Sequence, residues 1–458
     1  MRDDGRYGSV SELAAAEKLD RGYLGGVLML TLLAPEIVEA IMDGRQPTRR
    51  PAGEVRAVDR FVRVSPPIGP PATESHGSGE LFLDQMVAEH LDRRLGCPQE
   101  RRTFHPSGEC RIILTAHQPR ATLALTRQEV LMPIRTRLTE RLGIRVPILN
   151  APMGGHAGGR MAAALTEAGG LGLLACFGPV IDKSEFWIEE QFAAAGNTRI
   201  GAGFITWRLA AYPHLLDLAL ARAPAAMMLS FGDPAPFAPR IKQAGTLLIC
   251  QVQTLAYARQ ALDAGADILV AQGGEAGGHG SVLRSTMTLV PEVADLLARE
   301  SPDTLLVAAG GIADGRGLAA ALMLGADGIL MGSRLWASDE SLAGPVSKQA
   351  VVEANGDSTV RTNVADMIGG RAWPREFTQR IIRNDFTARW HGREHELEPV
   401  VETVREDYRE GIKARDLRRS EVNTTEAVGL IHSIAPIATI VDDVCTAAER
   451  LLSGSWQK

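Results

Sequence analysis

Eight short apolar runs, repeated along the chain, constrain its fold more than any other feature. They are VPILNA (146–151), LGLLA (171–175), RIGAGF (199–204), AAMMLS (225–230), TLLICQ (246–251), DILVAQ (267–272), TLLVAA (304–309) and DGILMG (327–332). Alanine-rich stretches with helical spacing separate them, and their starts lie 21 to 37 residues apart. Continuous apolar strands that alternate with helices are typical of parallel strands buried on both faces. Eight such units predict an α/β fold, the (β/α)8 TIM barrel; an open doubly wound sheet is the alternative.

The widest interval between runs, 37 residues, follows the sixth run and opens with AQGGEAGGHGSV (271–282). Barrel chemistry lies at the carboxyl ends of the strands, so this long loop is a candidate active-site loop. Its only titratable side chains are Glu275 and His279. The surrounding glycines free His279 to face a ligand, and a neutral imidazole suits a general base for a carbon acid. A purely structural histidine is the alternative, and Glu275 is expected to anchor the loop.

The loops after the seventh and eighth runs, AAGGIADGRG and LMGSRLW, are predicted to hold a phosphate. Barrel loops in these two positions cradle phosphates with backbone N–H groups. The candidate ligands are Gly310, Gly311, Gly332 and Ser333, with Arg334 as a nearby charge. Tight turns between strand and helix are the plainer explanation of the glycines. Because no GxxxxGK[ST] sequence occurs, a P-loop nucleotidase is not indicated.

The loop after the first run begins NAPMGGH and is the candidate for contact with a planar ring. Asn150 offers amide hydrogen bonds, Pro152 and Met153 offer an apolar edge, and the glycines let a ligand approach. His156 is either a polar loop residue or a residue that faces the substrate. Gln272, at the end of the sixth run, is placed to hydrogen-bond the polar edge of such a ring.

Four of these segments, in order, resemble motifs of the nitronate monooxygenases, formerly called 2-nitropropane dioxygenases. They are NAPMGG (150–155), AQGGEAGGHG (271–280), AAGGIADGRG (308–317) and GADGILMGSR (325–334), and SFGDPAPF (230–237) and WHGREHEL (390–397) fit the same family. The resemblance covers residues 132–458 and implies one non-covalently bound FMN. The implied FMN contacts are Asn150, Ala151, Pro152 and Met153 at the ring, Gln272, Gly277 and Gly278 along the ring and ribityl chain, and Gly310, Gly311, Met331, Gly332 and Ser333 at the phosphate.

The resemblance also implies an activity. His279 matches the family's catalytic histidine, which takes the α-proton of a nitroalkane or interacts with a bound nitronate. With FMN and O2 the nitronate then gives a carbonyl compound and nitrite, while the protein supplies orientation and a base. Flavin-dependent enoyl-acyl-carrier-protein reductases are similar, carry a Gly-Gly-His loop and use NAD(P)H, so they remain the alternative. The natural substrate stays open.

The first 131 residues lie outside this resemblance. Residues 9–48, in an expected segment 1–48, resemble a helix-turn-helix fragment of recombinase-like proteins, and residues 49–131 lack periodicity and are expected to form a loosely ordered linker. A DNA-binding module fused to a flavoprotein is therefore an alternative of another class. Residues 1–131 carry 17 Lys plus Arg and 18 Asp plus Glu, so they lack the basic footprint of nucleic-acid binding. A non-native extension is the simpler explanation.

The rest of the chain is divided by its strand pattern. Residues 132–355 are expected to form the FMN-binding barrel, and residues 356–458 a helical subdomain packed on it. Helices are predicted at 376–386, 396–412 and 437–452. This subdomain either covers the barrel mouth or forms the contact of a homodimer.

Composition narrows the class of protein. The 458 residues carry a net charge of −6, with 45% hydrophobic and 23% charged residues, which is typical of a globular protein without a nucleic-acid or membrane surface. There is no apolar run of about 18 residues and no signal-peptide core, so we expect a cytoplasmic protein without a membrane anchor. The five cysteines include no CxxC pair and predict neither a disulfide framework nor a zinc site.

Overall fold

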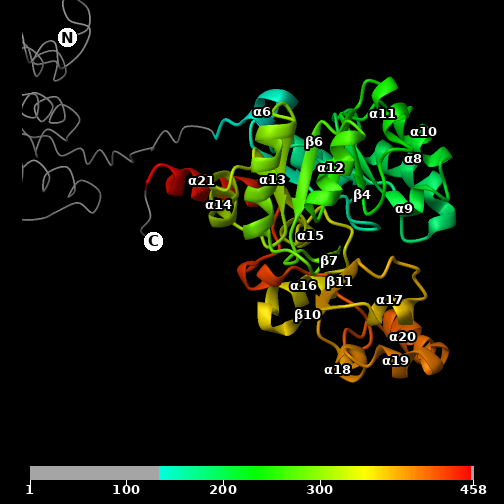
Figure 1. Ribbon diagram of the computed structural model, residues 1–458. Coiled ribbons are helices and arrows are strands. Elements are labelled where there is room, and N and C mark those ends of the chain that lie inside the picture. Colours follow the sequence, from blue (N-terminus) through cyan, green and yellow to red (C-terminus); the bar gives the residue numbers. More distant parts are fainter. Residues whose placement is uncertain (1–133, 455–458) are drawn as a thin grey trace, which may run out of the picture. The chain divides into compact units, whose positions relative to one another are not determined.

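The eight predicted strands form a parallel barrel. The computed structural model describes residues 134–454, so the expectations for residues 1–48 and 49–131 lie outside the described part. The barrel strands are β1 (Ile148–Asn150), β2 (Leu173–Ala175), β3 (Gly201–Ile205), β4 (Ala226–Ser230), β5 (Leu247–Val252), β6 (Ile268–Gln272), β8 (Leu305–Ala309) and β9 (Gly328–Met331). They pair in the order β1-β9-β8-β6-β5-β4-β3-β2, which confirms the TIM barrel (Figure 1).

The barrel closes between β1 and β2 through one backbone bridge and one side chain. Leu149 and Leu171 form an isolated parallel bridge. Beside it, the Asn150 side-chain oxygen accepts from the Leu173 N–H at 2.6 Å, and the Asn150 side-chain nitrogen donates to the Leu173 C=O at 2.9 Å. The fully buried amide of Asn150 therefore takes the place of backbone pairing at this seam.

Each barrel strand is buried on both faces, which explains the continuous apolar runs. Along β6, Ile268 and Val270 pack inside the barrel, whereas Leu269 and Ala271 pack under the helices. The helix α6 (Arg137–Leu142) closes the amino-terminal end, where Leu138 joins the interior cluster. The surrounding helices are α7 (Gly159–Glu167), α8 (Ser184–Ala194), α10 (His214–Leu220), α11 (Ala238–Gln243), α12 (Leu255–Asp263), α13 (Thr286–Glu300) and α14 (Gly315–Met323).

The last helix of this ring, α21 (Ile437–Leu452), comes from the end of the described chain, lies beside α14 (Figure 1) and also packs on α7. Gly315 permits the close contact, because a Cβ atom added there would lie 2.5 Å from the Cβ atom of Ala447. Residues 337–436, which we call the inserted region, therefore lie in sequence between β9 and the final helix of the barrel. The C-terminal part of the chain supplies one piece of the barrel itself.

The inserted region contains strands as well as the expected helices. Its elements are α16 (Pro345–Glu353), η2 (Gly356–Ser358), β10 (Thr359–Thr362), α17 (Val364–Gly369), β11 (Thr378–Ile382), α18 (Asp385–Trp390), α19 (Glu394–Leu397), η3 (Glu398–Val400), α20 (Val401–Ala414) and η4 (Glu426–Leu430). The predicted helix at 376–386 is wrong over β11. Gln379 and Ile381 are buried and their neighbours are partly exposed, which is the two-residue period of a strand.

A small antiparallel sheet joins the inserted region to the barrel. β10 pairs with β11, and β11 pairs with β7 (Gly278–Gly280), which lies in the glycine-rich loop after β6.

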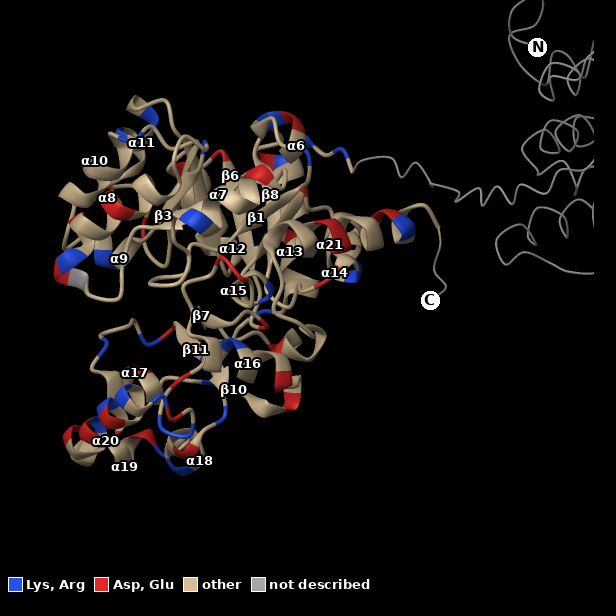
Figure 2. Ribbon diagram, turned by 180° about the vertical axis from the view of Figure 1, so that it is seen from behind, with Lys and Arg blue, Asp and Glu red and all other residues tan. Residues whose placement is uncertain are grey.

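Three further short segments complete the described chain: η1 (Ile181–Lys183), α9 (Thr206–Leu209) and α15 (Ser333–Trp336). Acidic and basic residues are interspersed over the helices and strands of the described chain (Figure 2). Within residues 134–454, every helix is too short or too polar to cross a membrane.

The seam between β1 and β2 yields a stability prediction. Asn150→Ala removes both bonds to Leu173 and leaves that backbone N–H and C=O unpaired inside the barrel. We expect the free energy of unfolding to fall by about 2–4 kcal/mol, measured by chemical denaturation. Asn197→Ala, at an exposed position, is the control and should change it by less than about 0.5 kcal/mol. Equal stability of the two variants would contradict the role assigned to Asn150.

Candidate active site

The glycine-rich loop after β6 is held by several side chains, of which the partly buried Arg361 on β10 makes the most contacts with it. Its guanidinium donates to five backbone carbonyls at 2.5–3.3 Å, those of Gly274, Ala276, Gly278, Gly280 and Thr378. Burial, together with the nearby charge of Arg380, lowers the pKa of Arg361 to about 10. Arg361 is thus still charged at neutral pH, and the loop is ordered although it is rich in glycine.

Glu275 is the loop anchor that the sequence predicts. Its carboxylate accepts from the Thr286 N–H at 2.9 and 3.0 Å and from the Thr286 hydroxyl at 3.0 Å. Its backbone carbonyl accepts from the Thr425 hydroxyl at 2.7 Å and from the Glu426 N–H at 2.9 Å. These bonds fix the loop to α13 on one side and to the inserted region on the other.

His279 lies on β7 with its imidazole fixed in direction and in plane. Its Nε2 atom is 2.9 Å from Oδ2 of Asp366 on α17. The ring stacks on Trp373, with 3.5 Å between ring centroids and 10° between planes. Only 14% of the side chain is exposed. The glycines around His279 suggest a freely moving side chain, but the structure shows one that is held on two sides by the inserted region.

A chain of charged groups continues behind His279. Oδ1 of Asp366 lies 3.0 Å from Nε of Arg371, and Nη1 of Arg371 lies 2.5 Å from Oε1 of Glu421. The Tyr408 hydroxyl donates to the other oxygen of Glu421. Asp366 thus pairs with His279 through a hydrogen bond and with Arg371 through an ion pair, which keeps its carboxylate in one orientation.

The environment of His279 favours its neutral form. Burial lowers its pKa below the usual 6.5, and the charges of Arg371 and Arg361 act in the same direction, whereas Asp366 opposes them. A neutral imidazole beside a carboxylate donates its Nε2 hydrogen to that carboxylate. The Nδ1 atom is then left with a free lone pair, and it is the atom of His279 able to accept a proton.

The loop after β1 crosses the barrel mouth. A Cβ atom added at Gly203 of β3 would lie 2.6 Å from Pro152, and one added at Gly332 would lie 3.9 Å from the Met153 sulfur. The Ala151 N–H donates to the Met331 carbonyl at 2.9 Å. The predicted ring contacts at 151–153 therefore lie over the ends of β9, β1 and β3.

Two predicted cofactor residues pack within the barrel wall. The side chains of Asn150 and Met331 are both 0% exposed. The Asn150 amide is occupied at the seam with β2, and Met331 belongs to the layer between strands and helices.

The ends of β8 and β9 present unpaired backbone donors. Within residues 134–454, no acceptor is bonded to the N–H groups of Gly310, Gly311, Gly332 and Ser333. Ala309 pairs with Leu330, so both loops leave neighbouring strands at the same level. A Cβ atom added at Gly277 would lie 2.6 Å from the Ser333 hydroxyl, so the glycine-rich loop approaches the same place. This donor set fits the phosphate of FMN.

Arg334 and His156 contact parts of the protein outside the loops predicted to hold the cofactor. The buried Arg334 guanidinium donates to the Ser433 carbonyl at 3.0 Å, so this charge is directed at the inserted region. His156 contacts the edge of the Trp336 ring, with 5.5 Å between centroids, and burial lowers its pKa. Arg334 therefore contacts the inserted region, and His156 contacts α15.

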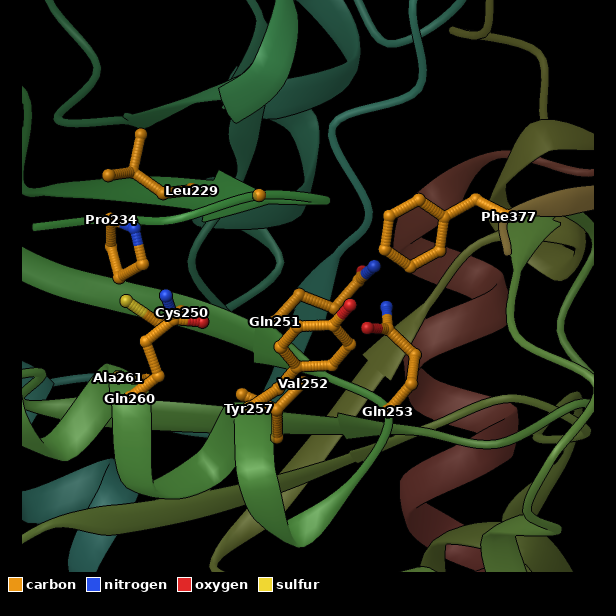
Figure 3. A pocket seen from close by; sticks show the side chains of 11 residues that line it. Leu229, Pro234, Cys250, Gln251, Val252, Gln253, Tyr257, Gln260, Ala261 and Phe377 are labelled. Atoms are coloured by element: carbon orange, nitrogen blue, oxygen red, sulfur yellow. The ribbon is translucent and has the colours of Figure 1, made fainter. Parts of the chain in front are cut away.

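Gln272 links the glycine-rich loop to neighbouring strand ends. Its Nε2 donates to the His279 carbonyl at 3.2 Å, and its Oε1 accepts from Gln251 at 3.2 Å and from Gln253 at 3.0 Å. The same two glutamines line a pocket near the carboxyl ends of β4 and β5 (Figure 3). The other lining residues are Leu229, Gly232, Pro234, Cys250, Val252, Tyr257, Gln260, Ala261 and Phe377.

Gln379 is a site residue that sequence reasoning missed. It pairs with His279 across β11 and β7 and is 1% exposed. Its Nε2 and Oε1 atoms have no partner in the described part of the chain. An unpaired buried polar group costs about 1–3 kcal/mol, so this amide is free to pair with a polar group that enters beside His279. Asp366 and Trp373 were missed as well, because neither lies in a motif.

The pairing of His279 with Asp366 yields a titration prediction. Asp366→Asn removes the negative charge that raises the pKa of His279, while burial and the two arginines still lower it. We expect the NMR-observed pKa of His279 to lie below 6.5 in the unmodified protein and to fall further in Asp366→Asn. Asp357→Asn, in the exposed turn of η2, is the control and should leave the titration unchanged. A rise of the pKa in Asp366→Asn would contradict the proposed electrostatics.

Solved structures with a similar fold include the structure of FabK from Thermotoga maritima. The TM-score is 0.60 at 31% identity, over 70% of this chain and 98% of that one. A nitroalkane oxidase from Streptomyces ansochromogenes has a TM-score of 0.56 at 24% identity, over 69% and 99% of the two chains, and shows the shared fold.

Curated relatives include two fungal nitronate monooxygenases. The Neurospora crassa protein is 31% identical over 65% of this chain and 87% of its own, and Metarhizium robertsii npaC is 33% identical over 67% and 92%. A Mycobacterium tuberculosis relative, 34% identical over 55% and 69%, is named (3aS,4S,5R,7aS)-5-hydroxy-7a-methyl-1-oxo-octahydro-1H-indene-4-carboxyl-CoA dehydrogenase. A family model described as nitronate monooxygenase matches residues 180–447. The chain therefore belongs to the nitronate monooxygenase family.

Proposed function

We propose that this chain binds FMN at the carboxyl ends of the barrel strands and uses O2 to convert alkyl nitronates into carbonyl compounds and nitrite. The observation that carries the proposal is the fixed, neutral imidazole of His279 at the mouth of a barrel of this family. The expected cytoplasmic location and the small-molecule substrate belong to the same proposal.

The cofactor would be held by groups that now lack partners. The unpaired N–H groups after β8 and β9, with Gly277 beside Ser333, would bind its phosphate. The loop at 151–153 would lie against its ring, and Gln379 is placed to pair with a polar edge of cofactor or substrate. FMN supplies the electron transfer between substrate and O2 when it is bound.

His279 would act as the base when the substrate is a neutral nitroalkane. Its Nδ1 lone pair would take the proton from the carbon that carries the nitro group, leaving the nitronate anion. Asp366 would stabilise the imidazolium that forms, since its carboxylate already accepts the Nε2 hydrogen. A substrate supplied as a nitronate needs no base, so His279 would only position it.

The direct test is the visible spectrum of the purified protein, followed by an assay with ethylnitronate in air. We expect a flavin spectrum and consumption of O2 with release of nitrite. A colourless protein that fails to bind added FMN would refute the cofactor assignment. FMN-loaded protein that releases no nitrite would refute the activity.

The role of His279 is separable from turnover of nitronates. In His279→Asn, kcat/KM for nitroethane should fall by about 10²–10⁴-fold, because the base is lost, while FMN stays bound and ethylnitronate is still oxidised. In the unmodified enzyme, kcat/KM for nitroethane should decline toward acid through a pKa below 6.5, since only neutral His279 accepts the proton. Unchanged nitroethane turnover in His279→Asn would remove His279 from the base role.

A second candidate is redox chemistry on an acyl thioester with NAD(P)H, as in the enoyl-acyl-carrier-protein reductases. The relative named as a carboxyl-CoA dehydrogenase favours it. Incubation with NADPH and a crotonyl thioester distinguishes the two. Thioester reduction without nitrite release from ethylnitronate would favour the second candidate over the first.

A further inference from the structure

Arg208 carries a positive charge without a counter-charge at the barrel mouth. It lies on α9, which begins directly after β3, and it is only partly exposed. Among the residues the structure describes, none forms an ion pair or a hydrogen bond with its guanidinium. Arg371 and Arg361, whose charges act on His279, are both bonded within the protein.

The guanidinium of Arg208 is nevertheless held in place. It lies over the Trp207 ring, 4.9 Å from the centroid, and 5.9 Å from the centroid of Phe177. Trp207 meets Trp373 edge to face at 5.4 Å between centroids, and Trp373 is the ring that stacks on His279. Aromatic contacts therefore connect Arg208 to the ring that positions the base.

The charges that act on Arg208 belong to the same site. Burial lowers its pKa and so does the charge of Arg371, whereas Tyr212 and Asp366 raise it. Asp366 is already hydrogen-bonded to His279 and ion-paired with Arg371, so it does not neutralise Arg208. A half-buried cation without a partner is unfavourable, and an anion from outside the chain would relieve it.

The shape of the group narrows the choice of anion. A guanidinium is planar and presents a fork of N–H donors, which matches a planar anion with two oxygens on one atom. Both the nitronate group and a carboxylate have this geometry. Neutral nitroalkanes carry no such charge and would gain it only when His279 has taken their proton.

We propose that Arg208 is the anion-binding residue of the substrate site, which pairs its guanidinium with the two oxygens of a nitronate or of a carboxylate farther along the substrate. This inference rests on the proposed function for the identity of the anion. Its geometry predicts a preference for substrates that are already charged over neutral nitroalkanes.

Equilibrium binding tests the proposal without turnover. Nitrate, which resembles the nitronate group, and propionate, which carries a carboxylate, are titrated separately while tryptophan fluorescence, to which Trp207 and Trp373 contribute, is followed. We expect saturable binding to the unmodified protein and an increase of about tenfold or more in Kd for Arg208→Gln. Arg199→Gln, at an exposed arginine, is the control and should bind as the unmodified protein does.

Kinetic measurements then distinguish binding of the nitronate oxygens from binding of a carboxylate farther along the substrate. If Arg208 binds the nitronate oxygens, Arg208→Gln raises KM for ethylnitronate and for propionate-3-nitronate alike. If it binds a remote carboxylate, KM rises for propionate-3-nitronate alone. Arg208→Lys, which keeps the charge but loses the planar fork, should recover part of the affinity and shows that the position tolerates substitution.

Two results overturn the proposal: equal Kd values for both anions in Arg208→Gln and Arg199→Gln, or no saturable binding of either anion to the unmodified protein. Absence of nitrite release together with weakened anion binding in Arg208→Gln would instead refute the proposed function and retain the anion site. Failure of the anion-binding proposal is thereby distinguished from failure of the proposed function.

Discussion

The bonds from Arg361 to the carbonyls of the glycine-rich loop are the interaction on which the rest of the site depends. A loop with so many glycines has a large conformational entropy to lose when it is ordered. One partly buried guanidinium supplies charge-assisted donors to several of its carbonyls at once, and β11 adds a strand ladder on the same segment. The imidazole of His279 on β7 is therefore held as firmly as a side chain on a barrel strand.

Most of the barrel could be predicted from the sequence, because strands buried on both faces have a continuous apolar pattern that survives in any context. The contacts that fix His279 could not be predicted from the sequence. The glycines predict freedom at that position, and the residues that remove it, Arg361, Asp366 and Trp373, lie more than 80 residues later in the chain. The strand β11 was hidden as well, since its short run of Thr, Gln, Arg and Ile fits a helix equally well when its register with β7 is unknown.

The candidate site likewise contains some residues that the sequence motifs predict and others that they do not. Motif residues that follow strands, such as Gly310 and Ser333, are brought together because parallel strands end at one edge of the barrel. Asn150 lies in a motif too, yet its amide closes the barrel wall, a role that depends on a gap in the β1–β2 pairing that no local pattern reveals. The residues that fix His279 belong to the inserted region, whose fold follows no repeat.

The position of α21 in the chain has a consequence for biogenesis. During synthesis, β9 emerges before the inserted region, and the helix that covers α7 and α14 emerges only after it. Until then, the apolar faces of α7 and α14 are uncovered, and contacts this distant in sequence form late. The ring of helices around the barrel can therefore be completed only after the whole inserted region has been synthesised.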